Sequence, residues 1–152
     1  MDKLYNYINE KLSNGILLKD IKDNIFTYFD SETINYCELK ANYNENKYNR
    51  IKINDYSNEL FEMILICWDT NSETKIHDHP ERGCILYLID GQMEEYLYNK
   101  DLVLYKTTSF NSKSTSYMEN SLGYHKLRCI DKAISLHIYS PPNYKMRIMD
   151  KV

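Results

Sequence analysis

Apolar residues recur at helical spacing over the first part of the chain, and this pattern predicts three short helices. They are expected at residues 1–13, 18–28 and 32–39, with Ser31 as the cap of the third. An asparagine-rich stretch at 42–47 then predicts a loop. Three short helices cannot bury much apolar surface among themselves, so we expect them to pack on a sheet formed by the rest of the chain.

From Tyr48 onward the pattern changes to the alternation and short apolar runs that are typical of β-strands. Asp90-Gly91 predicts a tight hairpin turn between two of them. Many short strands with few helical patterns between them favour a sandwich or barrel. The strands are expected at residues 48–53, 60–68, around 77–79, and at 84–89, 92–98, 102–107, 115–118, 124–129, 133–139 and 146–149.

No internal repeat or flexible linker divides the 152 residues, so we expect one domain over residues 1–152. Its helical part should cover about 1–40 and its β-barrel about 48–150. The net charge of −3 comes without a basic face, which argues against nucleic acid as a partner. Because the chain has neither an apolar leader nor an apolar run long enough to span a membrane, we expect a cytoplasmic protein without membrane contact.

Two histidines two residues apart, His77 and His79, are the first candidates for chemistry. In an extended segment their imidazoles point to the same side and Asp78 points to the other. A third histidine, His125, follows a turn that ends at Gly123. Three imidazoles from separate segments suit one transition-metal ion with open positions. Taken singly, the pair fits a solvated surface equally well, and a lone histidine such as His125 is more often a structural strand residue.

The segment ending in Tyr139 alternates between two kinds of side chain. Apolar residues at 134, 136 and 138 share one face, and Ser135, His137 and Tyr139 share the other. The polar face makes sense if it lines a pocket in which each group hydrogen-bonds the next, while the alternative is a half-exposed strand. A serine hydrolase is disfavoured, since Ser135 lacks the sharp strand-to-helix turn that presents such a nucleophile.

Together, the motifs HxHxxxxC, GxH and SxHxYSPP resemble the cysteine dioxygenase family of the cupin superfamily, over roughly Tyr48 to Pro142. The resemblance implies a mainly β fold, a cupin-type antiparallel barrel with short N-terminal helices. It also implies that His77, His79 and His125 bind Fe(II), and that the protein is a monomeric enzyme oxidising L-cysteine with O2 to cysteine sulfinic acid. Three neutral imidazoles leave the ion at +2, a charge that an anionic thiolate substrate can offset.

The same resemblance suggests roles for further residues. Cys84 and Tyr139 match a pair that becomes a thioether crosslink in animal enzymes, and Ser135 and His137 match the pair behind the tyrosine. The segment Tyr48-Asn-Arg50 matches the substrate-binding segment, in which the arginine holds the carboxylate.

The chain departs from the animal pattern in two places, and both bear on the substrate. Gly83 stands where mammalian members have a histidine, and the tail after Pro142 is short, which predicts a more open pocket. The alternatives are therefore a dioxygenase of another thiol, such as 3-mercaptopropionate, cysteamine or a peptidyl cysteine, and a metal-binding cupin without catalysis. Zinc in place of iron is compatible with the same ligands.

Overall fold

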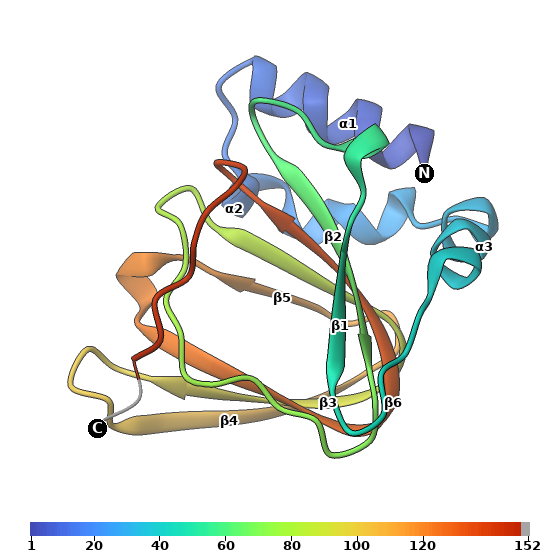
Figure 1. Ribbon diagram of the computed structural model, residues 1–152. Helices are drawn as coiled ribbons and strands as arrows, with labels where there is room; N and C mark the ends of the chain where they lie inside the picture. Colours follow the sequence, from blue (N-terminus) through green and yellow to red (C-terminus); the bar gives the residue numbers. More distant parts are fainter. Residues whose placement is uncertain (150–152) are drawn as a thin grey trace.

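The computed structural model describes residues 1–149 and shows short helices packed against one side of a rolled β-sheet (Figure 1). The helices are α1 (Asp2–Ser13), α2 (Leu18–Ile21), α3 (Ser31–Lys40) and the 3₁₀ helices η1 (Lys22–Tyr28), η2 (Asn54–Tyr56) and η3 (Asn120–Leu122). The helix predicted at 18–28 is α-helical only at its start and continues as 3₁₀ in η1. The predicted single domain over 1–152 stays a prediction, and its last three residues lie outside the described part.

The cap of α3 is Asp30, so the prediction that Ser31 caps this helix was wrong by one residue. The Asp30 side chain accepts hydrogen bonds from the backbone N–H of Thr33 at 2.9 Å and from the Thr33 hydroxyl at 3.0 Å. Ser31 already lies inside the helix. These hydrogen bonds, the backbone one foremost, hold the pKa of Asp30 below its usual value.

Six antiparallel strands form one sheet in the order β1-β2-β6-β3-β4, with β5 paired to β3, within the described residues. The strands are β1 (Tyr48–Lys52), β2 (Glu62–Trp68), β3 (Cys84–Tyr98), β4 (Leu104–Asn111), β5 (Thr115–Met118) and β6 (Tyr124–Tyr139). The two long strands, β3 and β6, pair along most of their length and bend together, which rolls the sheet into the barrel of Figure 1.

Asp90 and Gly91 lie inside β3, so the predicted hairpin turn at this point was wrong. The register between β3 and β6 shifts between Leu88 and Asp90 and again before Gln92, which marks an irregular, bulged stretch. Gly91 has a φ of +95°, and an added Cβ would lie 2.5 Å from the carbonyl oxygen of Lys132. Because the neighbouring strand β6 continues past the bulge, the chain bends here without reversing.

The alternation predicted for the end of β6 is confirmed, and it divides the buried side chains into two clusters. Ile134, Leu136 and Ile138 pack with residues of α1, α2 and η1 on the outer face of the sheet. Tyr139 faces the barrel interior, where Trp68 and the inward residues of β2 and β3 form the second cluster. The helices therefore cover one face of the sheet, and the other face encloses the polar side chains of β6.

The segments around His77 and Ile148 are not strands, contrary to the prediction. They are irregular chain joined by isolated bridges, in which His77 pairs with both His125 and Ile148. Hydrogen bonds from Asp78 N–H to the Arg147 carbonyl and from Met149 N–H to the Ile76 carbonyl tie the two segments together. Among residues 1–149 no helix is long and apolar enough to cross a membrane.

Candidate metal centre and active-site pocket

The three histidines that the sequence singled out converge inside the barrel. One nitrogen of each of His77, His79 and His125 lies within 4.8 Å of those of the other two, and all three side chains are buried. Their ring centres are 4.2 to 5.0 Å apart. The first two rings come from one irregular segment and the third from β6, held together by the bridge between His77 and His125.

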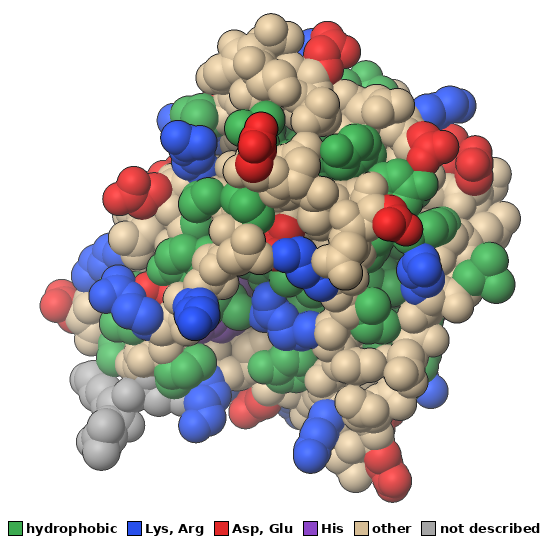
Figure 2. All heavy atoms as spheres, turned by 45° about the horizontal axis from the view of Figure 1, so that its top comes forward, with side chains coloured by type: hydrophobic (Ala, Val, Ile, Leu, Met, Phe, Trp, Pro, Cys, Tyr) green, Lys and Arg blue, Asp and Glu red, His purple; other side chains and the backbone are tan. Residues whose placement is uncertain are grey.

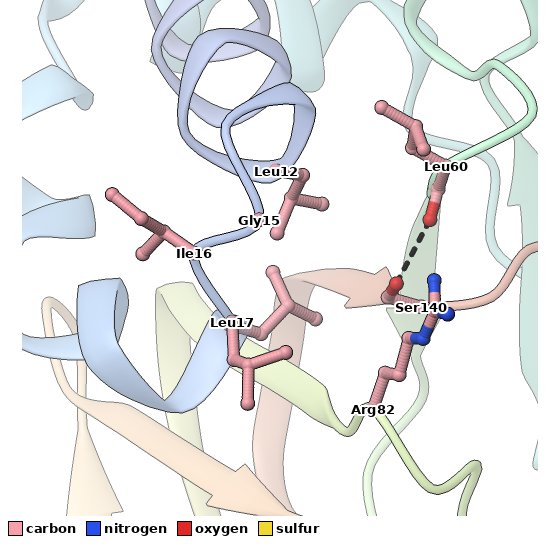
Figure 3. Close-up of a pocket in the computed structure, with 8 residues that line it drawn as sticks. Leu12, Gly15, Ile16, Leu17, Leu60, Arg82 and Ser140 are labelled. Atoms are coloured by element: carbon pink, nitrogen blue, oxygen red, sulfur yellow. Dashed lines mark hydrogen bonds between the residues drawn. The ribbon is translucent and has the colours of Figure 1, made fainter.

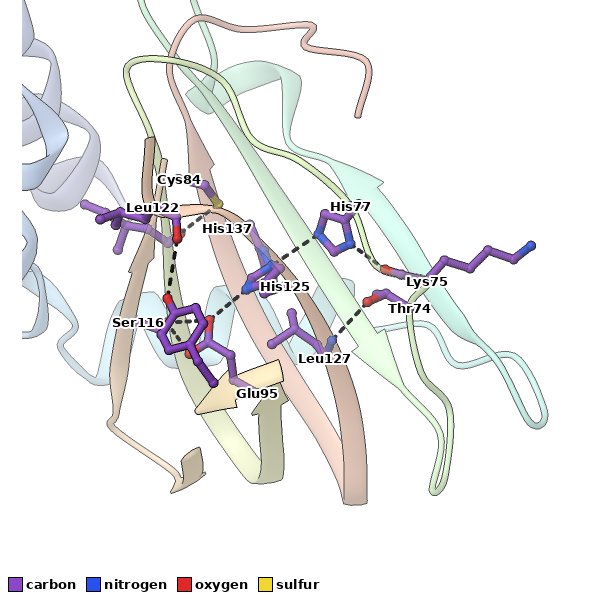
Figure 4. Close-up of polar contacts among 12 residues, drawn as sticks. Thr74, Lys75, His77, Cys84, Glu95, Ser116, Leu122, His125, Leu127 and His137 are labelled. Carbon is purple, nitrogen blue, oxygen red and sulfur yellow. Dashed lines mark hydrogen bonds and ion pairs between the residues drawn. The ribbon is translucent and has the colours of Figure 1, made fainter. Parts of the chain in front are cut away.

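Hydrogen bonds fix the tautomers of two of these rings (Figure 4). His77 Nδ1 lies 2.7 Å from the Lys75 carbonyl oxygen, and His125 Nδ1 lies 2.7 Å from Oε1 of Glu95. Both nitrogens face acceptors, so each carries the proton and leaves a lone pair on Nε2. The two Nε2 atoms are 3.1 Å apart, and their lone pairs face each other. That separation fits two adjacent ligands of one ion, since metal–imidazole bonds are about 2.1 Å long.

Two imidazoles of this centre disfavour protonation, which leaves their nitrogen lone pairs available for a metal ion. Burial, foremost, and then the neighbouring imidazoles lower the pKa of His79 and His125 well below the usual value, so neutral rings are favoured. Within the described chain the Nδ1 of His79 is buried without a hydrogen-bond partner. Buried polar atoms normally have one, so an unpartnered nitrogen on the third ring, together with the facing lone pairs of the other two, fits a metal-binding site. The donor set therefore fits a divalent transition metal.

Asp78 points away from the imidazoles, as the extended geometry predicted, and ties down the C-terminal segment. It accepts hydrogen bonds from the backbone N–H of Arg147 at 2.7 Å and from its guanidinium at 2.6 Å. Burial raises the pKa of Asp78, but hydrogen bonds from Arg147 and Tyr144 outweigh this effect and leave the pKa below its usual value. These hydrogen bonds hold the segment that carries His77 and His79 in place.

The polar face of β6 forms a hydrogen-bonded chain that includes Trp68, a residue that the sequence analysis did not single out. The indole N–H of Trp68 donates to Ser135 Oγ at 2.8 Å, and Ser135 Oγ lies 2.9 Å from His137 Nε2. His137 Nδ1 lies 3.4 Å from the hydroxyl oxygen of Tyr139. Burial, foremost, and then the positive charge of Arg50 lower the pKa of His137 well below its usual value, so this ring is neutral.

Tyr139 and Cys84 are cross-strand partners on β6 and β3, and their side chains are hydrogen-bonded. Burial raises the pKa of Cys84 to about 12, while the contacts with Tyr139 and Arg50 act in the opposite direction. The guanidinium carbon of Arg50 lies 5.7 Å from the centre of the Tyr139 ring. Arg50 is otherwise exposed at the mouth of the site, where it can reach a bound anion.

These groups surround a pocket of about 210 Å³. Its lining consists of Tyr48, Arg50, Ile66, Trp68, Thr74, Lys75, His77, His125, Leu127, His137, Tyr139, Met146 and Ile148. In Figure 2 a histidine shows in a hollow of the surface, bordered by Lys and Arg side chains. The tail after Pro142 supplies Met146 and Ile148 to the wall of this pocket. The expectation that the short tail leaves the pocket more open than in animal members stays a prediction.

Arg82, which follows the paired histidines closely in the sequence, does not line this pocket. It borders a separate hollow of about 190 Å³ between the α1–α2 connection and the end of β6 (Figure 3). There Ser140 Oγ donates a hydrogen bond to the Leu60 carbonyl at 2.8 Å. Arg82 also borders a hollow of about 530 Å³ that His79 lines together with Arg147. Arg50 is the arginine that lines the pocket with His77 and His125.

Comparison with known proteins places this site in a family. The sequence model of cysteine dioxygenase type I matches residues 9–152. The chain belongs to this family. It is 28% identical to cysteine dioxygenase type 1 of Danio rerio over 160 residues, covering 88% of this chain and 79% of that protein. It is 27% identical to the Rattus norvegicus enzyme, with 68% of this chain and 56% of that protein aligned.

Solved structures show the same fold at low sequence identity. A Klebsiella pneumoniae protein with a double-stranded β-helix domain superposes with a TM-score of 0.61 at 14% identity, covering 76% of this chain and 95% of that one. A cupin superfamily protein from Desulfitobacterium hafniense gives a TM-score of 0.57 at 8% identity, covering 68% and 85%. The fold is therefore the cupin barrel, as the resemblance implied, with short helices added at its N-terminal end.

Proposed function

We propose that the protein is an Fe(II)-dependent thiol dioxygenase that converts L-cysteine and O2 into cysteine sulfinic acid. The observation that carries this proposal is the convergence of His77, His79 and His125 beside a pocket that presents Arg50 and Tyr139. Membership of the cysteine dioxygenase type I family supports the class of reaction. The conversion needs no further reactant, because a thiol RSH and O2 together contain the atoms of the sulfinic acid RSO2H.

The metal would be held by the three imidazoles, with His77 and His125 donating through Nε2. Bound ferrous iron supplies the oxygen chemistry, and the chain supplies position and polarity. Imidazole ligands bring no formal charge, and burial favours the neutral forms of His79 and His125. A ligand set of this charge favours a thiolate over a thiol in the substrate. The side chains therefore select a sulfur ligand without themselves neutralising the metal.

Arg50 is the residue that we expect to bind the substrate carboxylate. Its guanidinium lies over the Tyr139 ring and can donate two parallel hydrogen bonds, which a lysine cannot. Tyr48 forms the adjoining wall and packs against Trp68, with ring centres 4.9 Å apart. A carboxylate held here places the substrate thiol on the side of the pocket that the histidines line.

The hydrogen-bonded chain on β6 would orient the hydroxyl group of Tyr139. The Trp68 indole can only donate, so Ser135 accepts from it and gives its own hydrogen to Nε2 of neutral His137. His137 Nδ1 then carries the ring proton and donates it to the tyrosine oxygen. This direction leaves the hydroxyl hydrogen of Tyr139 for Cys84 or for a substrate in the pocket, where it stabilises developing negative charge.

We also infer that Cys84 and Tyr139 can form a thioether bond, supported by their cross-strand pairing and hydrogen bond. The bond would join Sγ to a ring carbon with loss of two hydrogens and two electrons, and O2 would accept them and leave as hydrogen peroxide. Intact-protein mass spectrometry after turnover tests this step. A mass two units lower is expected in the wild type, and the C84S variant should keep its full mass.

Anaerobic loading with ferrous iron, followed by L-cysteine and O2, tests the proposed function. We expect cysteine sulfinic acid, identified by mass, from the wild type and none from the His125→Ala variant. Zinc loading should give protein of the same fold and no product, which separates iron chemistry from metal binding. Wild-type protein that holds iron and makes no sulfinate from L-cysteine or from any other thiol would contradict the proposal and favour a cupin without catalysis.

The nearest alternative is the same reaction on another thiol, and the charge of the pocket separates the candidates. Arg50 and Lys75 line it, and no Asp or Glu of the described chain does. This lining favours a thiol that carries a carboxylate, such as L-cysteine or 3-mercaptopropionate, over cationic cysteamine. A higher kcat/KM for cysteamine than for L-cysteine would overturn the substrate assignment.

A further inference from the structure

Glu95 is a buried carboxylate that the reaction outlined above does not use. It lies on the inward face of β3 and is 5% exposed. Its Oε1 is 2.7 Å from His125 Nδ1, and the Ser116 hydroxyl lies 3.0 and 2.9 Å from its two carboxylate oxygens. Figure 4 shows this group behind the His125 ring, on the side away from His77. A buried glutamate costs free energy unless its charge is used or compensated.

The position of Glu95 rules out contact with a substrate. It does not line the pocket, and the His125 ring stands between it and the facing nitrogens of the metal centre. Its effect must therefore pass through His125. A carboxylate that accepts the Nδ1–H of a metal-bound imidazole fixes the tautomer, holds the ring plane and makes Nε2 a stronger donor.

We propose that Glu95 is a positioning residue of the metal centre, supplying through His125 the negative charge that the three-histidine ligand set lacks. This inference rests on the proposed metal centre and adds a second role to the site. The carboxylate stands one hydrogen bond outside the ligands, so it lowers the charge of the centre without occupying a coordination position. Glu95 thereby strengthens ferrous binding and stabilises the ferric state relative to the ferrous state.

The neighbouring residue on β3 offers a matched control. Glu94 carries the same side chain and bonds to the Tyr96 hydroxyl instead of to a metal ligand. Glu95→Gln and Glu94→Gln each remove one negative charge one position apart, and glutamine retains a hydrogen-bond acceptor. A difference between them reports the contact with His125 and excludes a general effect of net charge.

The experiment measures ferrous affinity by anaerobic competition with a chelator, and the iron reduction potential of the loaded protein. We expect E95Q to weaken ferrous binding by roughly 10- to 100-fold and to shift the potential upward. E94Q should match the wild type in both readouts. Ser116→Ala removes a donor to Glu95 and keeps its contact with His125, so ferrous affinity should not fall and the potential should not rise.

The outcomes separate this inference from the function on which it rests. If the wild type fails to bind ferrous iron, or His125→Ala binds it equally well, the metal centre itself is overturned. If the wild type binds iron and E95Q matches it in affinity and potential, only the role of Glu95 is overturned. Should E95Q not fold, Ser116→Ala decides: a rise in potential or a loss of affinity in that variant contradicts the proposal.

Discussion

Arg50 reaches the pocket from β1 and offers a planar donor pair over the Tyr139 ring. We expect Arg50→Gln to lower kcat/KM for L-cysteine by roughly 10- to 100-fold, because charge-assisted hydrogen bonds contribute about 1.5–3 kcal/mol. Arg50→Lys should recover part of this loss, and turnover of cysteamine should hardly change in either variant. Steady-state oxygen uptake with both thiols measures the effect. Equal losses for the two substrates would contradict a carboxylate contact.

Trp68 carries the donor at the start of the chain that ends at Tyr139. Trp68→Phe keeps most of the apolar packing and removes the N–H, so Ser135 loses the bond that holds its oxygen in place. We expect kcat to fall by about 3- to 10-fold with little change in KM, since one neutral hydrogen bond contributes about 1 kcal/mol. The iron content of the variant should equal that of the wild type. An unchanged kcat would contradict a role of Trp68 in orienting Tyr139.

For individual residues, regular spacing in the sequence predicted which side chains share a face. It did not predict the residues from other strands that bond to them. Two-residue spacing predicted that His77 and His79 would share a side, and it placed Ser135, His137 and Tyr139 on one face. Glu95 and Trp68 belong to other strands, and spacing within one segment carries no information on which strand lies opposite. The available signal for Glu95 was an acidic residue at an inward position of an alternating strand. Recognising its partner required the register of β3 with β6.

The contribution of the cap residue Asp30 to the stability of α3 can be tested through its pH dependence. Its pKa lies below the ordinary value of 3.8, chiefly because the Thr33 N–H bonds to the ionised form. The cap therefore stabilises the helix fully above that value, and the effect is lost as the pH falls through the lowered pKa. We expect Asp30→Ala to lower Tm at pH 7, and we expect a smaller difference from the wild type near pH 2.

Ser31→Ala provides the control for this prediction. Ser31 lies within α3 and is not the cap, so its substitution should leave Tm almost unchanged at both pH values. Thermal unfolding followed by circular dichroism measures both variants. A larger loss of Tm in the Ser31 variant than in the Asp30 variant would restore Ser31 as the cap.

Gly91 permits the bend of β3 against β6. With a φ of +95° and an added Cβ 2.5 Å from the Lys132 carbonyl oxygen, Gly91→Ala should cost at least about 2 kcal/mol of unfolding free energy. Gly15 also has a positive φ, +79°, but an added Cβ meets open space, so Gly15→Ala should cost only about 1 kcal/mol. Urea unfolding of both variants measures the difference, and equal losses would contradict the close approach at Gly91.

Helices and strands were predictable where the local sequence pattern determines them. They were not predictable where pairing with a distant segment of the chain determines them. Helix α1 and strand β5 lie where the pattern placed them. Asp90-Gly91 carries a hairpin signal, but the neighbouring strand continues past it and turns the signal into a bulge. The segments around His77 and Ile148 are joined by isolated bridges, in which His77 pairs with His125 and with Ile148, and Asp78 anchors Arg147. Neither segment forms a regular strand.

At the scale of the whole molecule, the sheet separates a layer of helices from the barrel interior that contains the candidate site. The helices fill the outer face with apolar contacts, and the inner face holds the histidines, the β6 network and the pocket. The tail after Pro142 closes one wall, which the sequence could not show because its length says nothing of where Met146 and Ile148 point. One rolled sheet thus brings residues from β1, β2 and β6 to a common pocket.

Isotopic labelling of the oxygen tests the central claim most directly. Iron-loaded protein given L-cysteine under ¹⁸O2 should release cysteine sulfinic acid that is four mass units heavier than the product made under ordinary oxygen, since both atoms of O2 enter the product. A product that carries a single labelled oxygen, or an iron-loaded protein that yields no sulfinate at all, would contradict the account.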